Sequence, residues 1–341
     1  MIYLNCDYLE GAHPSVLKKL SETNLEQTIG YGEDPYCAQA SAMIRSAFSC
    51  PNAHVHFLVG GTQANTTVIA AALRPYEGVL CADTGHINVH ETGAIESTGH
   101  KCLAMPSRDG TITASQVREA VALQGHDEHM VKPGMVYISL STELGTMYTR
   151  QQLADLHAAC REAGLYLYID GARLGCGLAA PGCDITPADV AKYSDAFTVG
   201  GTKLGALFGE AMVITNPELN HNFRYMIKQR GGLLAKGRLL GLQFIALMED
   251  DLYFTLGRKA VGQALQIRQA LLDAGIPLFI DSPTNQQFPI FTEEQLAHIS
   301  QDFALSLWEK LPNGHTVMRV CTSWATPDAY VEQFIETLQQ L

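Results

Sequence analysis

The fold is decided by the stretch from Asp195 to Thr215, which reads DAFTVGGTKLGALFGEAMVIT. It contains two short apolar runs of β type, joined by a loop of small residues that carries one lysine, Lys203. A lysine ammonium is strongly hydrated and gains nothing from a position among glycines. Lys203 is therefore either a surface accident or an amine that is kept accessible for chemistry.

The two runs in this stretch are the last of a series of short apolar segments that alternate with helical patterns. The segments cover residues 54–60, 78–83, 101–106, 135–140, 165–170, 196–201 and 211–215. Such alternation is typical of a layered α/β sheet. Residues 150–164 supply one of the helices between strands, because Leu153, Leu156, Cys160 and Ala163 recur on one helical face and Gly164 can end it. We predict a crossover helix there.

The pattern changes near residue 245. Helical periodicity continues to about Ala274, two β-like runs follow around Phe288 and Val320, and a last helix closes the chain. In that helix we expect Thr326 to be the cap and Pro327 the first position, with apolar residues recurring at helical spacing. These apolar residues are Tyr330, Phe334 and Leu338. We predict a large domain over residues 1–245 and a smaller one over 246–341.

Composition excludes several classes of function. The 341 residues carry a net charge of −12, and phosphate backbones require a basic surface, so we expect no nucleic-acid partner. Nine cysteines occur without CxxC pairing, which favours reduced thiols and a cytoplasmic location over disulfides or zinc. No apolar run approaches 18 residues and no targeting pattern opens the chain, so neither secretion nor a membrane span is expected.

Three further clusters accompany Lys203. Gly60, Gly61 and Thr62 separate a β-like run from a helical pattern that begins near Gln63. The free N–H groups at such a turn can bind an anion, and the Thr62 hydroxyl is an additional donor. The alternative is that glycine serves only the tight turn, and the residues of this cluster leave both interpretations open.

The second cluster is YLYIDGARLG, in which Asp170 ends a buried strand. A buried carboxylate needs a fixed cationic or N–H partner, and Arg173 is near in sequence, so a structural pair and a catalytic role are equally compatible with the residues. The third cluster contains His86, His90 and Glu91 in a loop rich in small polar residues. An imidazole there can stack on a ring or bind a metal; no third ligand has suitable spacing, so no metal is expected.

Together these residues suit one chemistry. A lysine amine forms a Schiff base with an aldehyde cofactor, a helix N-terminus holds a phosphate, a carboxylate keeps a pyridine nitrogen protonated, and an imidazole stacks on the ring. We therefore predict pyridoxal 5'-phosphate as the cofactor.

The chain also resembles the low-specificity L-threonine aldolases of the β-eliminating lyase group. The stretches that carry the resemblance are DYLEGAHPSVL, YGEDPYC, GGTQAN, GHINVHETGAIESTGHK, STELGTMY, YIDGARL, GGTKLGA, LLAKGRLL and MRVCTSWAT. The resemblance implies fold type I, with a mainly parallel seven-stranded sheet in the large domain and a smaller α+β C-terminal domain. It also implies cleavage of L-threonine and L-allo-threonine to glycine and an aldehyde.

The same resemblance assigns roles to residues. Lys203 would form the Schiff base, Asp170 would pair with the pyridine nitrogen, and His86 would stack on the ring. Cofactor contacts are implied for Gly60, Gly61, Thr62 and Arg173, with Lys236 or Arg238 reaching the phosphate of a neighbouring subunit. Substrate contacts are implied for Cys6, Arg173 and Arg319, which bind the amino acid's carboxylate. Shared active sites imply a homo-oligomer, a dimer or a tetramer.

Two points depart from the family pattern or stay open. Cys6 stands where some members have a serine, and a thiol is a weaker donor. The base that takes the β-hydroxyl proton is open among His90, Glu91, Thr142 and a phosphate-bound water, and we include Glu91 among the catalytic residues. The alternative function is another fold type I activity: β-elimination, phenylserine cleavage, racemisation or transamination.

Overall fold

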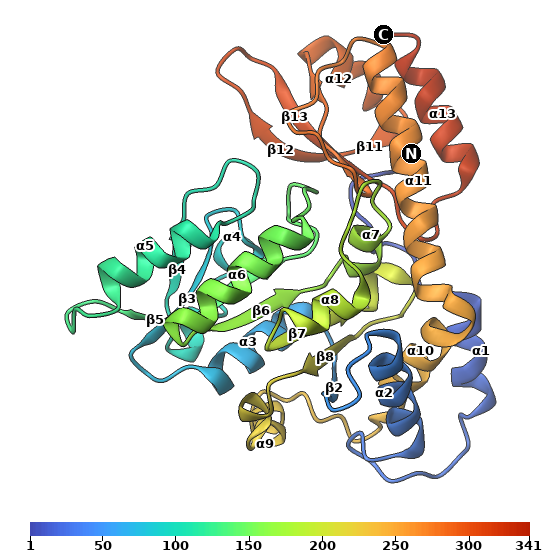
Figure 1. Cartoon of the computed structure of the whole chain (residues 1–341). Coiled ribbons are helices and arrows are strands. Elements are labelled where there is room, and N and C mark those ends of the chain that lie inside the picture. Colours follow the sequence, from blue (N-terminus) through green and yellow to red (C-terminus); the bar gives the residue numbers. More distant parts are fainter.

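The computed structural model describes every residue from 1 to 341, and a seven-stranded sheet forms its centre (Figure 1). The strand order is β2-β8-β7-β6-β5-β3-β4. Strand β8 is antiparallel to both of its neighbours, whereas the other pairs are parallel. The bounds are β2 His54–Leu58, β3 Glu77–Ala82, β4 Cys102–Met105, β5 Lys132–Ser139, β6 Tyr166–Asp170, β7 Ala196–Gly200 and β8 Glu210–Ile214. All seven predicted strands are confirmed.

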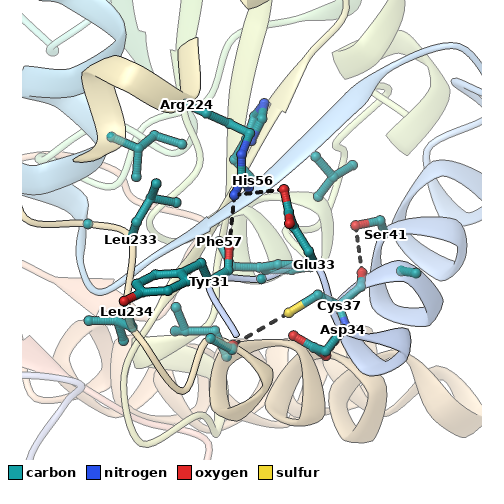
Figure 2. A pocket seen from close by; sticks show the side chains of 17 residues that line it. Tyr31, Glu33, Asp34, Cys37, Ser41, His56, Phe57, Arg224, Leu233 and Leu234 are labelled. Carbon is teal, nitrogen blue, oxygen red and sulfur yellow. Dashed lines mark hydrogen bonds and ion pairs between the residues drawn. The ribbon is translucent and has the colours of Figure 1, made fainter. Parts of the chain in front are cut away.

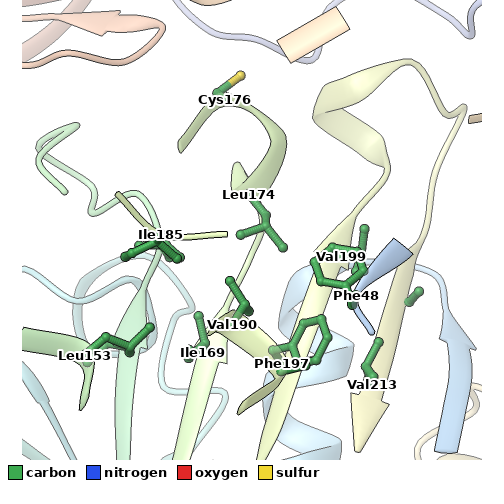
Figure 3. Close-up of a cluster of buried hydrophobic side chains, with 14 of the residues drawn as sticks. Phe48, Leu153, Ile169, Leu174, Cys176, Ile185, Val190, Phe197, Val199 and Val213 are labelled. Carbon is green, nitrogen blue, oxygen red and sulfur yellow. The ribbon is translucent and has the colours of Figure 1, made fainter. Parts of the chain in front are cut away.

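Side chains point alternately to the two faces of the sheet, so both faces carry apolar residues and helices cover both. In β5, Val136 and Ile138 join one buried cluster, whereas Met135 and Tyr137 join another. The first cluster, part of which Figure 3 shows, also contains residues of eight α-helices, six of which lie between residues 35 and 248. These six helices are α2 Pro35–Ala47, α5 Ala114–Gln124, α6 Arg150–Ala163, α7 Leu174–Leu178, α8 Pro187–Lys192 and α10 Arg238–Met248. The helix α1, Pro14–Glu22, packs against α10.

The opposite face is covered by α3 (Gly61–Ala72), α4 (His86–Val89) and α9 (Phe223–Gln229). The predicted crossover helix is confirmed as α6. Thr149 caps its N-terminus in a capping box with Gln152, and Gly164 ends it at a φ of 65°. That left-handed conformation is accessible to glycine without a steric penalty.

The C-terminal part packs at one end of the large sheet, as Figure 1 shows in orange and red. Its helices are α11 Leu252–Asp273, α12 Glu293–Ile299 and α13 Asp328–Leu338. Its strands are β9 Gln286–Gln287, β10 Ile290–Phe291, β11 Phe303–Ala304, β12 Ser306–Lys310 and β13 Thr316–Cys321. Antiparallel pairing gives the order β10-β13-β12, with β9 also paired to β13. The two β-like runs expected around Phe288 and Val320 thus fall in this small sheet.

The N-terminus belongs to this same part of the molecule. Strand β1, Ile2–Tyr3, pairs in parallel with β11, and Ile2 and Leu4 are buried in the cluster that contains Phe303 and Phe334. The chain therefore begins beside its C-terminal part before it enters the large sheet. The predicted division at residue 245 takes no account of this pairing between the N-terminal strand and the C-terminal part. The division itself stays a prediction.

The last helix begins later than we expected. Helix α13 starts at Asp328 with Pro327 as its N-cap, and no side chain bonds to its free N–H groups. Thr326 instead accepts a hydrogen bond from the Ser323 N–H group at 2.7 Å, so its hydroxyl serves the preceding turn. Phe334 is fully buried, as its spacing predicts, but Tyr330 remains 43% exposed.

All nine cysteines are free thiols, as the sequence predicts. No helix in the structure combines the length and the apolar character that crossing a membrane requires.

Candidate active site

A cavity of about 240 Å³ lies where the strands of the large sheet end. Its wall includes residues at the ends of β5 and β6, the loop after β7 and the first residue of β8. Ligands in open α/β sheets bind at this edge. The wall contains seven of the residues selected from the sequence, namely Gly60, Gly61, Thr62, His86, Asp170, Arg173 and Lys203.

Lys203 lies in a one-turn 3₁₀ helix, Thr202–Leu204, which follows β7 after one residue. Gly205 follows with a φ of 98°, which lets the chain reverse and enter β8. Burial, followed by the nearby Arg173 guanidinium, lowers the pKa of Lys203. A lowered pKa increases the fraction of neutral amine, which is the nucleophilic form. The loop of small residues therefore places a reactive amine in the cavity.

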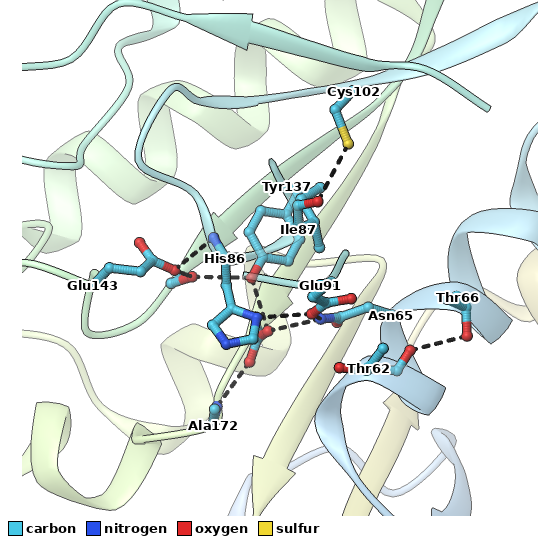
Figure 4. Close-up of polar contacts among 12 residues, drawn as sticks. Thr62, Asn65, Thr66, His86, Ile87, Glu91, Cys102, Tyr137, Glu143 and Ala172 are labelled. Atoms are coloured by element: carbon cyan, nitrogen blue, oxygen red, sulfur yellow. Dashed lines mark hydrogen bonds and ion pairs between the residues drawn. The ribbon is translucent and has the colours of Figure 1, made fainter. Parts of the chain in front are cut away.

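Asp170 is the last residue of β6 and is held by three donors. Its Oδ1 accepts the Ala172 N–H group at 2.9 Å, and its Oδ2 accepts the Tyr137 hydroxyl at 2.8 Å and the Asn65 amide at 3.2 Å. Figure 4 shows this network. The structural Asp170–Arg173 pair that the sequence left open is not formed, because neutral donors satisfy the carboxylate.

Arg173 instead forms an ion pair with Asp7. Its Nε and Nη2 atoms donate to the two Asp7 oxygens at 2.7 and 3.0 Å, and the Asn285 amide donates to Asp7 Oδ2 at 2.9 Å. Burial alone would raise the pKa of Asp7, but Arg173 and then Lys203 hold it well below its usual value. The N-terminal segment thus fixes the arginine beside the cavity, a role for Asp7 that the sequence did not indicate.

His86 begins the short helix α4, and its ring is oriented by Glu91. The Nδ1 atom lies 2.8 Å from Glu91 Oε1, which also accepts the Asn65 amide at 2.7 Å. Because a carboxylate only accepts hydrogen bonds, Nδ1 carries the hydrogen in this contact. The Glu91 side chain has no exposed surface and is absent from the cavity wall. Its geometry is that of a residue that positions His86, in contrast to our expectation of a direct catalytic part.

The turn of Gly60, Gly61 and Thr62 opens helix α3. Gly60 is the N-cap, and no side chain occupies the first N–H groups of the helix. A Cβ atom added to Gly60 or Gly61 would meet nothing within 4 Å, so the space beside this backbone is open to a ligand. Free N–H groups at a helix N-terminus favour an anion. The turn, the amine of Lys203 and the carboxylate of Asp170 together fit pyridoxal phosphate.

Cys6 and Arg319 lie outside the cavity wall. Cys6 is buried directly before Asp7, and burial raises its pKa. Arg319, on β13, donates to the Asn5 carbonyl at 3.1 Å, and its buried Nε atom has no partner. After burial and His86, Arg319 contributes to the lowered pKa of His90. The expected contact of Arg319 with the substrate carboxylate stays a prediction.

Lys236 and Arg238 do not reach the cavity of their own chain. Lys236 is exposed, and Arg238 donates to the carbonyl groups of Thr23 and Asn24 at 2.7 and 3.2 Å. Gly237, which stands between them, is one of the residues that line a second cavity of about 140 Å³, shown in Figure 2. No lysine lines this second cavity, so it lacks the amine that the predicted chemistry requires.

The structure also adds polar residues to the cavity wall. Asn65, Ser139 and Glu210 had no functional role in the sequence analysis, whereas Ser141 and Glu143 belong to a segment in which some members of the family carry a histidine and this chain has none. Burial and the Asp170 charge raise the pKa of Glu210 well above its ordinary value. Asn65 stands inside the GGTQAN motif and could have been selected there, whereas Glu210 carries no local signal beyond its place at the start of an apolar strand.

Comparisons with known proteins agree with this geometry. A family profile described as "Beta-eliminating lyase" matches residues 5–291. The low specificity L-threonine aldolase of Pseudomonas aeruginosa is 33% identical over 287 residues, covering 83% of this chain and 82% of that protein. The enzyme of the same name from a Pseudomonas species is 31% identical over 332 residues, or 96% and 94% of the two chains.

Solved structures give the same result. A Leishmania major threonine aldolase has a TM-score of 0.98 and 44% identity, covering 100% of this chain and 99% of the other. An aspartate aminotransferase variant of Thermus thermophilus has a TM-score of 0.73 at 12% identity, with 100% and 91% coverage, and shows the fold alone. The α/β fold expected from the sequence, fold type I, is confirmed, and the chain belongs to the β-eliminating lyase family.

Proposed function

We propose that the protein is a pyridoxal phosphate-dependent aldehyde-lyase that cleaves L-threonine and L-allo-threonine to glycine and an aldehyde. One observation carries the proposal. An amine with a lowered pKa, a helix N-terminus with free N–H groups and a carboxylate held by three donors surround one cavity. Its relatives from Pseudomonas aeruginosa and Leishmania major, named L-threonine aldolase and threonine aldolase, support the same substrate.

The chain's own residues divide the work of holding the cofactor. Lys203 supplies the amine that would hold the aldehyde group of the cofactor and that would be exchanged for the amine of a substrate. Asp170 accepts the hydrogen of a protonated ring nitrogen, while Tyr137, Asn65 and the Ala172 N–H group keep its carboxylate in place. The Gly60–Thr62 turn holds the phosphate. When bound, pyridoxal phosphate supplies a ring that accepts the electron pair of the broken Cα–Cβ bond.

Two arginines are available for the substrate carboxylate. Arg173 uses Nε and Nη2 on Asp7, which fixes the plane of the guanidinium and leaves Nη1 outside this pair. Arg319 uses one nitrogen on a backbone carbonyl and has a buried Nε without a partner. A carboxylate suits such planar donors. Fixing the carboxylate sets which bond at Cα stands perpendicular to the ring, and that choice separates aldol cleavage from the other activities of this fold.

The test is release of aldehyde and glycine by the cofactor-loaded protein from L-threonine and L-allo-threonine, measured side by side. We expect equal amounts of acetaldehyde and glycine from both substrates, and no release by Lys203→Ala. A protein that binds the cofactor through Lys203 but cleaves neither substrate would refute the aldolase and would favour β-elimination or transamination instead.

We also infer a homo-oligomer with shared active sites, a dimer or a homotetramer. The support is that Lys236 is exposed and, like Arg238, lies outside the cavity wall of its own chain. Sedimentation velocity of the wild type tests this, and a monomer would contradict it. Nine free thiols favour a cytoplasmic location, which fractionation of the source cells tests.

A further inference from the structure

The segment that follows β5 places two polar side chains in the cavity wall. Ser141 and Glu143 both line the cavity, and they are only 5% and 8% exposed. Neither is used by the contacts that hold Lys203 or Asp170. Polar side chains that are buried beside a ligand cavity cost free energy unless a ligand or a neighbour satisfies them.

Only one of the two carboxylate oxygens of Glu143 accepts hydrogen bonds from the protein. Its Oε1 atom accepts the His86 N–H group at 3.0 Å and the Ser139 hydroxyl at 2.6 Å (Figure 4). Both bonds end on the same oxygen, which leaves Oε2 for a hydrogen bond from a ligand. Burial, and to a smaller extent the Asp170 charge, raises the pKa of Glu143. A raised pKa makes a carboxylate a stronger base near neutral pH.

Ser141 gives an independent observation beside it. Its Oγ atom is buried, lines the same cavity and has no hydrogen-bond partner. A hydroxyl left unpaired in a buried position costs free energy. The natural partner is a polar group of the ligand that enters the cavity, and the substrates of the proposed function carry one beside the reacting bond, the β-hydroxyl.

Three of the other candidates for a base, Thr142, Glu91 and His90, have surroundings that disfavour them. Thr142 is fully buried, and its hydroxyl is bonded to Thr146. Glu91 is enclosed by its contacts with His86 and Asn65. His90 is exposed and does not line the cavity. Glu210 also lines the cavity, but it belongs to β8 and not to the segment that carries Ser141.

We infer that Glu143 is the catalytic base of the cleavage, binding the substrate's β-hydroxyl together with Ser141 and taking its proton. The inference rests on the proposed function. The Glu143 carboxylate would receive the hydroxyl proton, and the O–H electron pair would become the second bond of the aldehyde carbonyl as the Cα–Cβ bond breaks. Pyridoxal phosphate, when bound, would supply the acceptor for the electron pair of that bond. Protonation at Cα then completes glycine, so atoms and electrons balance.

Other titratable groups face Glu143 and belong in any account of its pH dependence. They are His86 on α4, Asp170 on β6, Tyr137 on β5 and Tyr148 in the loop before α6. Burial raises the pKa of each tyrosine, so both stay neutral in the range where a carboxyl titrates. Glu143 works as a carboxylate, so turnover is present above its raised pKa and falls as the pH drops through it.

The experiment compares Glu143→Gln with the wild type in the cofactor-loaded state, using two reactions. One is cleavage of L-threonine; the other is exchange of the glycine α-proton with D₂O, followed by NMR, which involves no hydroxyl. We expect kcat for cleavage to fall by about 10²–10⁴, the range for loss of a general base. We expect KM to change little, the acid limb of the kcat profile to vanish, and both the cofactor absorbance and glycine exchange to persist.

Two further variants sharpen the result. Glu143→Asp keeps the carboxylate and should recover part of the cleavage and the acid limb, which a purely structural role would not require. Glu162→Gln, on the exposed end of α6, is the matched glutamate control and should leave both reactions unchanged.

Three outcomes would overturn the inference. A Glu143→Gln enzyme that cleaves threonine at the wild-type rate with the wild-type pH profile would show that another group is the base. Loss of glycine exchange together with cleavage would show that Glu143 supports the whole site rather than the hydroxyl. A wild type that exchanges glycine but cleaves no threonine would refute the proposed function, and with it this inference, and that failure is seen without any variant.

Discussion

The buried pair of Asp7 and Arg173 gives the sharpest test of how the site is built. Asp7 is 1% exposed at its side chain and Arg173 10%, and they share hydrogen bonds of 2.7 and 3.0 Å. Asp7→Asn keeps the size of the side chain but removes its charge, leaving the guanidinium buried without a counterion. Breaking a buried ion pair in this way costs about 3–5 kcal/mol.

That cost corresponds to a loss of about two to nearly four orders of magnitude in the folding equilibrium constant. The assay is urea unfolding followed by circular dichroism, at fixed protein and cofactor concentrations because ligand binding and assembly shift the apparent stability. The matched control is Glu162→Gln. Glu162 pairs with Arg118 through two bonds of 2.8 and 3.2 Å, but the two side chains are 58% and 50% exposed. We expect no measurable shift for this exposed pair.

The pH dependence of stability gives a second readout on the same variant. The pKa of Asp7 is lowered in the folded state, so its contribution is complete above its unfolded value, about pH 4, and is lost as the pH falls toward the folded value. Asp7→Asn should therefore flatten the acid side of the stability profile. Equal unfolding midpoints for Asp7→Asn and Glu162→Gln at neutral pH would refute the argument that the Asp7 charge stabilises the buried arginine.

Three further predictions concern the site itself. Lys203→Ala should abolish the absorbance of the lysine-bound cofactor and nearly all turnover, because no other lysine lines the cavity; turnover at the wild-type rate would exclude this lysine. Arg319→Ala should weaken substrate binding by about 2–4 kcal/mol, the cost of a desolvated charged hydrogen bond, and unchanged kinetics for L-threonine would show that the carboxylate binds elsewhere. Tyr137→Phe removes the 2.8 Å bond to Asp170 and should cost about 0.5–1.5 kcal/mol in urea unfolding with a weaker Kd for the cofactor; an unchanged Kd would mean that the other donors suffice.

Much of the large sheet could be predicted because its signals are local. The apolar runs that became β2 to β8 each lie within a few residues, and helix α6 carries both its cap and its terminal glycine in its own sequence. The last helix shows the limit of such signals. Thr326 has the right side chain for a cap, but its hydroxyl accepts a bond from the Ser323 N–H group instead. A local pattern cannot decide between two partners that are equally near in sequence.

The residues of the site also fall into two groups, those that local sequence signals reveal and those that only the packed fold reveals. Lys203, Asp170 and the Gly60–Thr62 turn were found from the sequence because each lies at or just after the end of a strand, and parallel strands bring these ends to one edge of the sheet. Their roles in catalysis stay predictions, as do those of Cys6, Lys236 and Arg238. Asp7 was missed because 166 residues separate it from Arg173, and no periodicity marks a contact over that distance.

The sequence by itself determined the order of strands and helices, the amine in a loop of small residues and the glycine turn that opens a helix. These features follow from backbone preferences and side-chain spacing over a few residues. Only the tertiary structure decided which charges meet: Arg173 with Asp7, Glu91 with His86, and Glu143 with the His86 N–H group. Such pairs form between elements brought together by burial of the core, so their partners depend on the packed fold rather than on neighbours along the chain.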